Sequence, residues 1–370
     1  LNRGSEVRIL QGAPNSMKKY LFSLLFILIF KNNIYADIKL NKIVDGLDSP
    51  WSLSILDENH YLITEKTGNI KILNKANKQV KKINHNLKIL QGGQGGLLDI
   101  LYYNKKLIVS YSENRGDWKS STSVAIADYN LKNLNFKNIF RSSPPIESGY
   151  HFGSRLIIKN NQLYISAGER GKGKIAQDFK KHPGSIIRIN LDGTVPKDNP
   201  RYKNKLGWLS EIYQIGIRNV QGMCLSPYDK EIYMTNHGAK GGDWFGRVIA
   251  GGNYGWNNLY WGGTKYSGLK GGPKWLPGYD KPIKYYVPSI AISACLIYSG
   301  KEFPEWQGDA LIASLKDQSI RKLTFKKNKF TKEEIILKNQ IGRIRDIKED
   351  SNGRILILTD KGGLWLLSKD

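Results

Sequence analysis

The stretch EDSNGRILILTDKGGLWLL, residues 349–367, contains two short apolar runs, each preceded by a polar turn. The runs ILILTD and LWLL have the length and the apolar content of β-strands. The segments DSNG and DKGG are rich in Asp, Asn and Gly, which are residues that favour turns. This stretch therefore predicts two antiparallel strands joined by a tight turn.

The same pattern recurs along the chain, whereas no sustained helical periodicity follows residue 36. Residues 56–73, 159–170 and 226–238 each combine a polar turn, a strand and a glycine-containing turn. Repeats of this kind are typical of sheets arranged radially, and a blade takes about 50 residues. The predicted fold class is all-β, a six-bladed β-propeller of four-stranded antiparallel blades, formed as a single domain by residues 37–370. A large β-sandwich or two all-β domains are the alternatives.

The first 36 residues are predicted to lie outside this domain. Met17 and two lysines precede an apolar run at 20–30, and a small residue, Ala36, follows. That order is typical of a secretory signal peptide, here residues 17–36, and the run is shorter than the roughly 20 residues of a membrane span. Residues 1–16 are interpreted as an upstream, non-native extension. An exported, periplasmic protein is therefore expected, with an uncleaved anchor as the lesser alternative.

The chain is strongly basic, with a formal net charge of +25. Residues 1–36 carry five basic residues and one acidic residue, so about +21 remains on the predicted domain. The lysines are scattered among Asn and Ile, and no basic patch interleaved with aromatic residues stands out, as a nucleic-acid surface would require. We therefore expect neither a nucleic-acid partner nor, after cleavage of the signal peptide, a membrane.

The two cysteines, Cys224 and Cys295, both lie in apolar runs. A secreted domain of this length does not require a disulfide, and the sequence shows no zinc or catalytic-cysteine pattern. Two buried thiols are the expectation, with a single bridge as the alternative.

Residues 237–278 differ from the rest of the chain. They are rich in Gly, Trp and Tyr and weak in strand pattern. A long insert of this kind is often functional, and its aromatic rings are suited to the wall of a cleft for a flat or sugar-like ligand. A purely structural surface loop is the other interpretation.

His151 is one of five histidines and lies between Tyr150 and Phe152. Imidazole is the usual general base near neutral pH. From the residues alone, however, a lone histidine between two aromatic residues is more often a packed or hydrogen-bonded structural ring.

Several cationic residues occur next to predicted strands. Arg218 and Asn219 precede a glycine turn, Lys316 follows a strand, and Arg343 and Arg345 are spaced for one face of a strand. Cations that converge on one cleft require an anion, and arginine binds carboxylates through two hydrogen bonds. Separate surface ion pairs, such as Arg345 with Asp346, are the alternative. The glycine-rich segment 91–100 lacks the lysine of a phosphate loop.

In chain order, these motifs resemble the soluble quinoprotein aldose sugar dehydrogenases of the glucose/sorbosone dehydrogenase family, from about Leu47 to the C-terminus. The resemblance is carried by GLDSPWSLSIL, LITEKTGNIKIL, GQGGLLDI, HFGSRLII, AQDFKKHPGSIIRINLDGTVPKDNP, IYQIGIRNVQGM, TNHGAKGGD, GGNYGW, PSIAISA, FPEWQGDALIASLK and GRIRDIKEDSNGRILILTD. It implies a six-bladed propeller that binds pyrroloquinoline quinone, a tricarboxylate. It also implies oxidation of the C1 hydroxyl of an aldose to a lactone, and electron transfer to a periplasmic acceptor.

The resemblance also assigns roles by motif. His151 matches the histidine that takes the proton of the anomeric hydroxyl. The positions that match cofactor-binding residues are Gln94, Arg170, Arg218, Asn219, Lys316, Arg343 and Arg345. In that role the cations would neutralise carboxylates and polarise the quinone oxygens.

Three positions depart from the family pattern. Asn236 and Trp244 replace residues that are usually acidic, and Val287 replaces an Asp, while Asp243 remains. Some relatives bind calcium in this part of the chain, and calcium requires several oxygen ligands. Calcium and the metal-binding residues are therefore left open. A non-catalytic propeller that binds a sugar or a protein is the main rival function. A propeller lactonase would need an acidic metal-binding set, which the sequence does not show.

Overall fold

The computed structural model describes residues 38–201 and 207–370, of which Lys39–Lys369 form one compact unit. The predicted upstream extension and signal peptide lie outside the described residues. The described residues form six sheets, antiparallel except for one short parallel pair, and two short 3₁₀ helices, η1 (Gly173–Gln177) and η2 (Pro304–Trp306). None of the described helices is long and apolar enough to cross a membrane.

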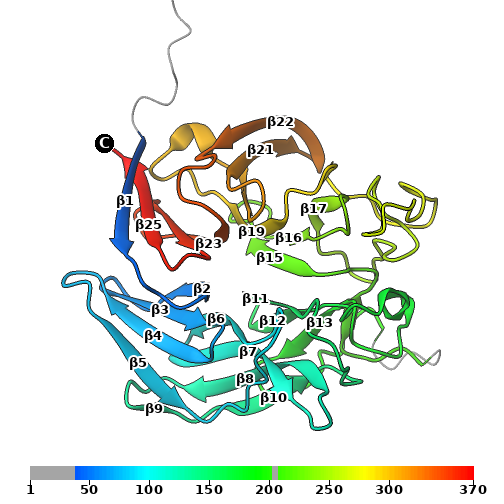
Figure 1. Cartoon of the computed structure of the whole chain (residues 1–370), viewed down its shortest axis with the longest axis horizontal. Coiled ribbons are helices and arrows are strands. Elements are labelled where there is room, and N and C mark those ends of the chain that lie inside the picture. The colour runs from blue at the N-terminus through cyan, green and yellow to red at the C-terminus, as the bar shows by residue number, and fades with distance from the viewer. Residues whose placement is uncertain (1–37, 202–206) are drawn as a thin grey trace, which may run out of the picture. The chain divides into compact units, whose positions relative to one another are not determined.

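The sheets follow one another along the chain as the blades of a propeller (Figure 1). The first blade contains β2 (Pro50–Ile55), β3 (His60–Glu65), β4 (Asn69–Asn74), β5 (Val80–His85) and β9 (Asn133–Leu134). The second contains β6 (Leu97–Tyr103), β7 (Lys106–Asn114), β8 (Ser120–Asp128) and β10 (Lys137–Arg141). The third contains β11 (Gly153–Lys159), β12 (Gln162–Ala167), β13 (Ser185–Asn190) and β14 (Ile212–Gln214).

The remaining blades complete the ring. The fourth contains β15 (Val220–Leu225), β16 (Ile232–Asn236), β17 (Asp243–Arg247) and β18 (Lys284–Tyr286). The fifth contains β19 (Ile292–Ile297), β20 (Ala310–Ser314), β21 (Ile320–Lys326) and β22 (Lys329–Ile336). The sixth contains β23 (Ile344–Glu349), β24 (Ile355–Thr359), β25 (Leu364–Lys369) and β1 (Ile38–Val44). The prediction of six four-stranded blades is confirmed, and the first blade adds the two-residue strand β9, which pairs in parallel with β5.

The ring closes in two ways. Each inner strand contacts the inner strands of both neighbouring blades, in the cyclic order β2, β6, β11, β15, β19, β23 and back to β2. The N-terminal strand β1 pairs with β25, so the sixth blade joins both ends of the propeller (Figure 1). Between the blades, apolar side chains pack into continuous clusters, for example Leu62 and Ile70 with Val109 and Tyr111.

The stretch at 349–367 folds as its turn residues predict. The Asp350 carboxylate accepts hydrogen bonds from the backbone N–H groups of Asn352 (2.9 Å) and Arg354 (3.0 Å) and so fixes the β23–β24 turn. Gly353 has a φ of +87°, and an added Cβ would lie 2.5 Å from the Cβ of Lys301. Glycine is therefore required at this position for both backbone conformation and space.

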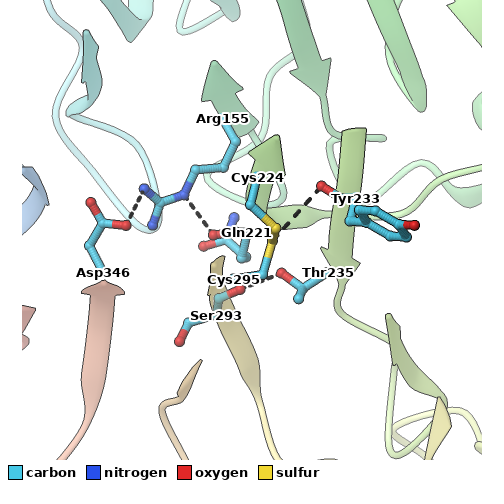
Figure 2. Close-up of a disulfide and its surroundings, with 8 residues drawn as sticks. All are labelled: Arg155, Gln221, Cys224, Tyr233, Thr235, Ser293, Cys295 and Asp346. Atoms are coloured by element: carbon cyan, nitrogen blue, oxygen red, sulfur yellow. Dashed lines mark hydrogen bonds and ion pairs between the residues drawn. A yellow bond between two sulfur atoms is a disulfide. The ribbon is translucent and has the colours of Figure 1, made fainter. Parts of the chain in front are cut away.

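The expectation of two buried thiols is wrong, because Cys224 and Cys295 form a disulfide. The bridge joins β15 to β19, the inner strands of the fourth and fifth blades (Figure 2). Both cysteines are 95% buried among apolar residues, a setting that suits free thiols as well as a bridge. The apolar neighbours of the two cysteines therefore do not distinguish free thiols from a disulfide.

Replacing both cysteines with alanine is expected to lower the free energy of unfolding by roughly 2–4 kcal/mol, because the bridge closes a loop between residues 71 apart. Urea unfolding of the oxidised wild-type and double-variant proteins measures the difference. A reductant should destabilise the wild-type protein and leave the double variant unchanged. An equal effect of the reductant on both proteins would contradict a stabilising role.

Candidate active site

A cavity of about 220 Å³ lies where the inner strands begin. Six of the eight residues that the sequence singled out line it: His151, Gln94, Arg218, Asn219, Arg343 and Arg345. They come from four different blades or the loops that lead into them. The sequence left open whether these cationic residues converge on one cleft, and the structure shows that Arg218, Arg343 and Arg345 do.

The inner strands direct side chains into the cavity through a shared irregularity. In all six, the pairing with the second strand shifts register near the start of the inner strand, as it does at a β-bulge. Trp51, Leu98, Gln221 and Arg345 lie at four of these shifts, and all four line the cavity. Bulges re-aim side chains, which explains how alternating strands present these residues to one space.

His151 is held in one orientation. Its Nδ1 lies 2.6 Å from Oε1 of Glu169, a side chain that is 98% buried. The backbone N–H of His151 donates to Oε1 of Gln94 (2.9 Å). Because a carboxylate can only accept, Nδ1 carries the proton and Nε2 keeps its lone pair. Glu169 was not singled out from the sequence, although it adjoins Arg170 in the motif AGER.

The surroundings of His151 keep its imidazole neutral. Burial is the main cause that lowers its pKa below the ordinary value of 6.5, and the positive charge of Arg218 adds to this effect. The hydrogen bond to Glu169 opposes the shift without reversing it. A neutral imidazole with a free Nε2 can accept a proton, so His151 has the state and the orientation of a general base.

A single side chain organises the Arg218–Asn219 turn. Oδ1 of Asn236 accepts hydrogen bonds from the backbone N–H groups of both residues, each at 2.9 Å. The Arg218 guanidinium then lies 5.3 Å from the Trp256 ring, and its Nε is 4.0 Å from Oε1 of Glu169. Asn236 is one of the departures from the family pattern, and here it serves as a cap for the turn.

Arg343 and Arg345 share one carboxylate. Their Nε atoms donate to the two oxygens of Asp360, at 2.9 Å and 2.8 Å. Burial alone would raise the pKa of Asp360, but the two arginines lower it overall. Arg345 therefore pairs with Asp360, and the pair of Arg345 with its neighbour Asp346, considered from the sequence, does not form.

Arg155 is buried behind the cavity and links four inner strands to its own strand, β11. Its guanidinium donates to Asp346 (3.0 Å) and to the carbonyl oxygens of Gln221 (2.6 Å) and Arg345 (3.1 Å). It also approaches Asp99 to 3.5 Å and lies 4.1 Å from the Trp51 ring. Figure 2 shows Arg155 reaching between Asp346 and Gln221. Arg155 thus fixes the backbone and the ring that form part of the cavity wall.

Two of the predicted site residues do not line the cavity. Arg170 is buried beside it, where its guanidinium donates to Tyr150 and Ser120 and lies 3.6 Å from the Phe152 ring, which does line the cavity. Lys316 is exposed and follows Leu315, a lining residue. The structure thus places Arg170 as a support of the His151 loop and Lys316 at the edge of the site.

Three buried polar atoms around the cavity have no hydrogen-bond partner among the described residues. They are Oε2 of Glu169, Nε of Arg218 and Nε2 of His237. Burial, followed by repulsion from Arg218 and Arg345, lowers the pKa of His237 to about 4, although Asp243 opposes this shift. Buried polar groups normally have partners, so these atoms are suited to a polar ligand.

The described residues do not provide a side-chain metal site. No group of three His, Cys, Asp or Glu residues among them is arranged to hold a metal ion. The Asp243 carboxylate is already engaged by the backbone N–H of Gly238 (2.9 Å) and by the Ser289 hydroxyl (2.7 Å). Trp244 stacks on Tyr254 with ring centroids 4.2 Å apart.

The family model for glucose and sorbosone dehydrogenases matches residues 47–367. The chain belongs to the glucose/sorbosone dehydrogenase family. The aldose sugar dehydrogenase YliI of Escherichia coli is 33% identical over 345 residues, which cover 90% of this chain and 92% of that protein. Quinoprotein glucose dehydrogenase B of Acinetobacter calcoaceticus is 28% identical over 59% of this chain and 52% of its own length.

Solved structures of the family have the same fold. The apo-form of the soluble aldose sugar dehydrogenase of Escherichia coli superposes with a TM-score of 0.85 at 32% identity, covering 90% of this chain and 99% of that chain. The PQQ-bound aldose sugar dehydrogenase of Streptomyces coelicolor has a TM-score of 0.75 at 20% identity, covering 90% of this chain and 98% of that chain, which shows a shared fold. The family that the motifs indicated is thus confirmed.

The lowered pKa of His151 predicts the pH at which the activity of this protein falls on the acidic side of its pH–rate profile. Because the imidazole must be neutral to accept a proton, kcat/KM is expected to fall only below about pH 6.5. Since Glu169 raises the pKa of His151, Glu169→Gln should move this limb to lower pH and also lower kcat, because the Nδ1–H is then less firmly held. pH–rate profiles of both proteins test this. A wild-type limb above pH 6.5 would contradict a buried, neutral His151.

Proposed function

We propose that this chain is a quinoprotein dehydrogenase that oxidises the C1 hydroxyl of aldose sugars to lactones, with pyrroloquinoline quinone as its cofactor. The observation that carries the proposal is the neutral His151, held by Glu169, in a cavity lined by Arg218, Arg343 and Arg345. Its relatives named as aldose sugar dehydrogenases and as a quinoprotein support the same assignment.

The donor set of the cavity fits a tricarboxylate. Three arginines line it, and guanidinium groups bind carboxylates with strong, paired hydrogen bonds. The unpartnered Nε of Arg218 and Nε2 of His237 supply further polar contacts for such a ligand. Among these residues, Arg218, Arg343 and Arg345 would hold the carboxylates, with Asn219 and Gln94 beside them. When bound, pyrroloquinoline quinone supplies the acceptor for a hydride.

The protein contributes the proton acceptor. Nε2 of His151 takes the proton of the C1 hydroxyl as the C1–H bond breaks, and the C1 hydrogen leaves with its electron pair. The sugar thereby loses two electrons and becomes the lactone. Glu169 stabilises the imidazolium that forms, because its carboxylate is already hydrogen-bonded to Nδ1.

We also propose that the protein works in the periplasm after export. The signal-like sequence at residues 17–36 supports this location, and so does the disulfide, because such bridges persist in oxidising compartments. A periplasmic carrier would then receive the electrons. Fractionation of cells that produce the full chain tests the location directly.

Reconstitution tests the function. The purified protein is titrated with pyrroloquinoline quinone, with and without calcium, and dye reduction is then followed with glucose and a panel of aldoses. Saturable, sugar-dependent reduction is the expected result. Tight quinone binding without turnover of any aldose would overturn the substrate class. Absence of quinone binding would favour the rival, a non-catalytic propeller that binds a sugar or a protein.

Arg343→Gln combined with Arg345→Gln is expected to weaken quinone binding roughly a hundredfold or more, because two charge-assisted contacts are lost. Fluorescence titration of the apo-protein measures the dissociation constant. Arg354→Gln is the matched control, since Arg354 pairs with Asp350 in the same blade and does not line the cavity. Normal affinity in the double variant would place the carboxylate site elsewhere.

A further inference from the structure

Tyr266 combines exposure with a place in the cavity wall. It is 71% exposed, and among the described residues it is the one exposed large apolar side chain that also lines the cavity. Such exposure means that the ring contributes little to the core. Single exposed apolar residues are common on protein surfaces, so what distinguishes Tyr266 is that its side chain also forms part of the cavity wall.

A hairpin holds Tyr266 at that place. The backbone of Thr264 pairs in both directions with Lys240, with N–H···O distances of 3.0 Å and 3.2 Å. The hairpin is closed by hydrogen bonds from Lys265 to the Leu269 carbonyl and from Gly268 to the Lys265 carbonyl, each at 2.9 Å. Lys240 belongs to the β16–β17 connection, which begins next to Asn236, the cap of the Arg218 turn. The hairpin is thus fastened to a loop of the site itself.

Tyr266 also contacts the catalytic surroundings. Nη2 of Arg218 donates to the Tyr266 hydroxyl at 3.3 Å, and the guanidinium lies 5.8 Å from the ring. Arg218 in turn lies 4.0 Å from Glu169, which orients His151. The phenol is therefore connected to the proposed base through two side chains, while one face of the residue remains open to solvent.

We propose that Tyr266 is a specificity-determining residue that contacts the sugar at the mouth of the cavity. Its ring would pack against the C–H face of a pyranose, and its hydroxyl would lie near the sugar hydroxyls, because tyrosine offers both an apolar body and a polar tip. This inference rests on the proposed function and adds a sugar-binding residue.

The test compares Tyr266→Ala and Tyr266→Phe with the matched control Leu269→Ala. Leu269 lies on the same hairpin and is 66% exposed, but it does not line the cavity. In the quinone-loaded protein, Tyr266→Ala should raise the KM for glucose about five- to tenfold and leave kcat within about threefold. Tyr266→Phe should have a smaller effect. Calorimetry with 1,5-anhydroglucitol, a pyranose without the C1 hydroxyl, should show the same loss of affinity without turnover.

Quinone titration of each variant separates this inference from the proposed function. A wild-type protein that fails to bind quinone overturns the proposed function, and this inference falls with it. Normal quinone binding with unchanged KM and calorimetric affinity in Tyr266→Ala overturns this inference alone. An equal loss of sugar affinity in Leu269→Ala would also overturn this inference, because it would assign the effect to the hairpin as a whole. Weakened quinone binding with an unchanged KM would assign Tyr266 to the cofactor and overturn the sugar contact.

Discussion

His151→Ala is expected to lower kcat by roughly 10²- to 10⁴-fold, because the C1 hydroxyl then has no positioned proton acceptor. Quinone affinity should stay close to that of the wild-type protein, since the arginines of the cavity are unchanged. His151→Gln should lose as much activity, because an amide can hydrogen-bond to Glu169 but cannot act as a base. Stopped-flow reduction of the loaded protein by glucose measures the chemical step directly.

His182 provides the matched control. It is a second buried histidine paired with a glutamate, with Nε2 3.1 Å from Oε1 of Glu211, but it does not line the cavity. His182→Ala should therefore leave the turnover of the folded, loaded protein unchanged. If His182→Ala and His151→Ala lost activity equally, or if His151→Ala retained it, the assignment of His151 as the base would be wrong.

Arg155→Met is expected to lower the free energy of unfolding by about 3–5 kcal/mol, because it leaves Asp99 buried without its cation and Asp346 with only Lys348, whose Nζ lies 3.7 Å away. Both carboxylates are 99% buried, and Arg155 is 97% buried between them. Urea unfolding measures the loss. Arg354→Met removes a partly exposed partner of Asp350 in the same blade and should cost less than about 1 kcal/mol.

Arg155 also holds the backbone and the ring that form part of the cavity wall, so its replacement should also affect ligand binding. Under conditions in which the variant remains folded, Arg155→Met should weaken quinone binding, because the Trp51 ring and the Arg345 carbonyl lose their common partner. A loss of less than about 1 kcal/mol in stability together with normal quinone affinity would contradict the central role of Arg155.

The turns and strands could be predicted from the sequence, because they depend on residues that are adjacent in the chain. Turn residues such as those at 350–353 act locally, and the apolar runs between them have strand length, so the blades follow from the repeated pattern. The family motifs then indicated which cations to consider together, and six of the eight chosen residues line one cavity.

Contacts between distant residues were not predictable in the same way. Glu169 follows β12 and reaches His151, which precedes the neighbouring strand β11, from 18 positions away. Asp360 follows β24 and accepts hydrogen bonds from Arg343 and Arg345, which lie at the start of β23. The disulfide joins residues 71 apart on different blades. The register shifts that turn Trp51 and Gln221 inward depend on strand pairing, which the sequence of one strand does not contain.

The pairing of β1 with β25 has a consequence for when the protein can first bind a ligand. The cavity draws on residues from Trp51 to Arg345, and the ring is complete only when the last blade has paired with the first strand. During synthesis or translocation, the full set of lining residues can therefore be assembled only after the sixth blade has emerged and folded, because non-local pairings form late. The proposed cofactor would then be acquired by the finished ring, in whichever compartment the chain completes its folding.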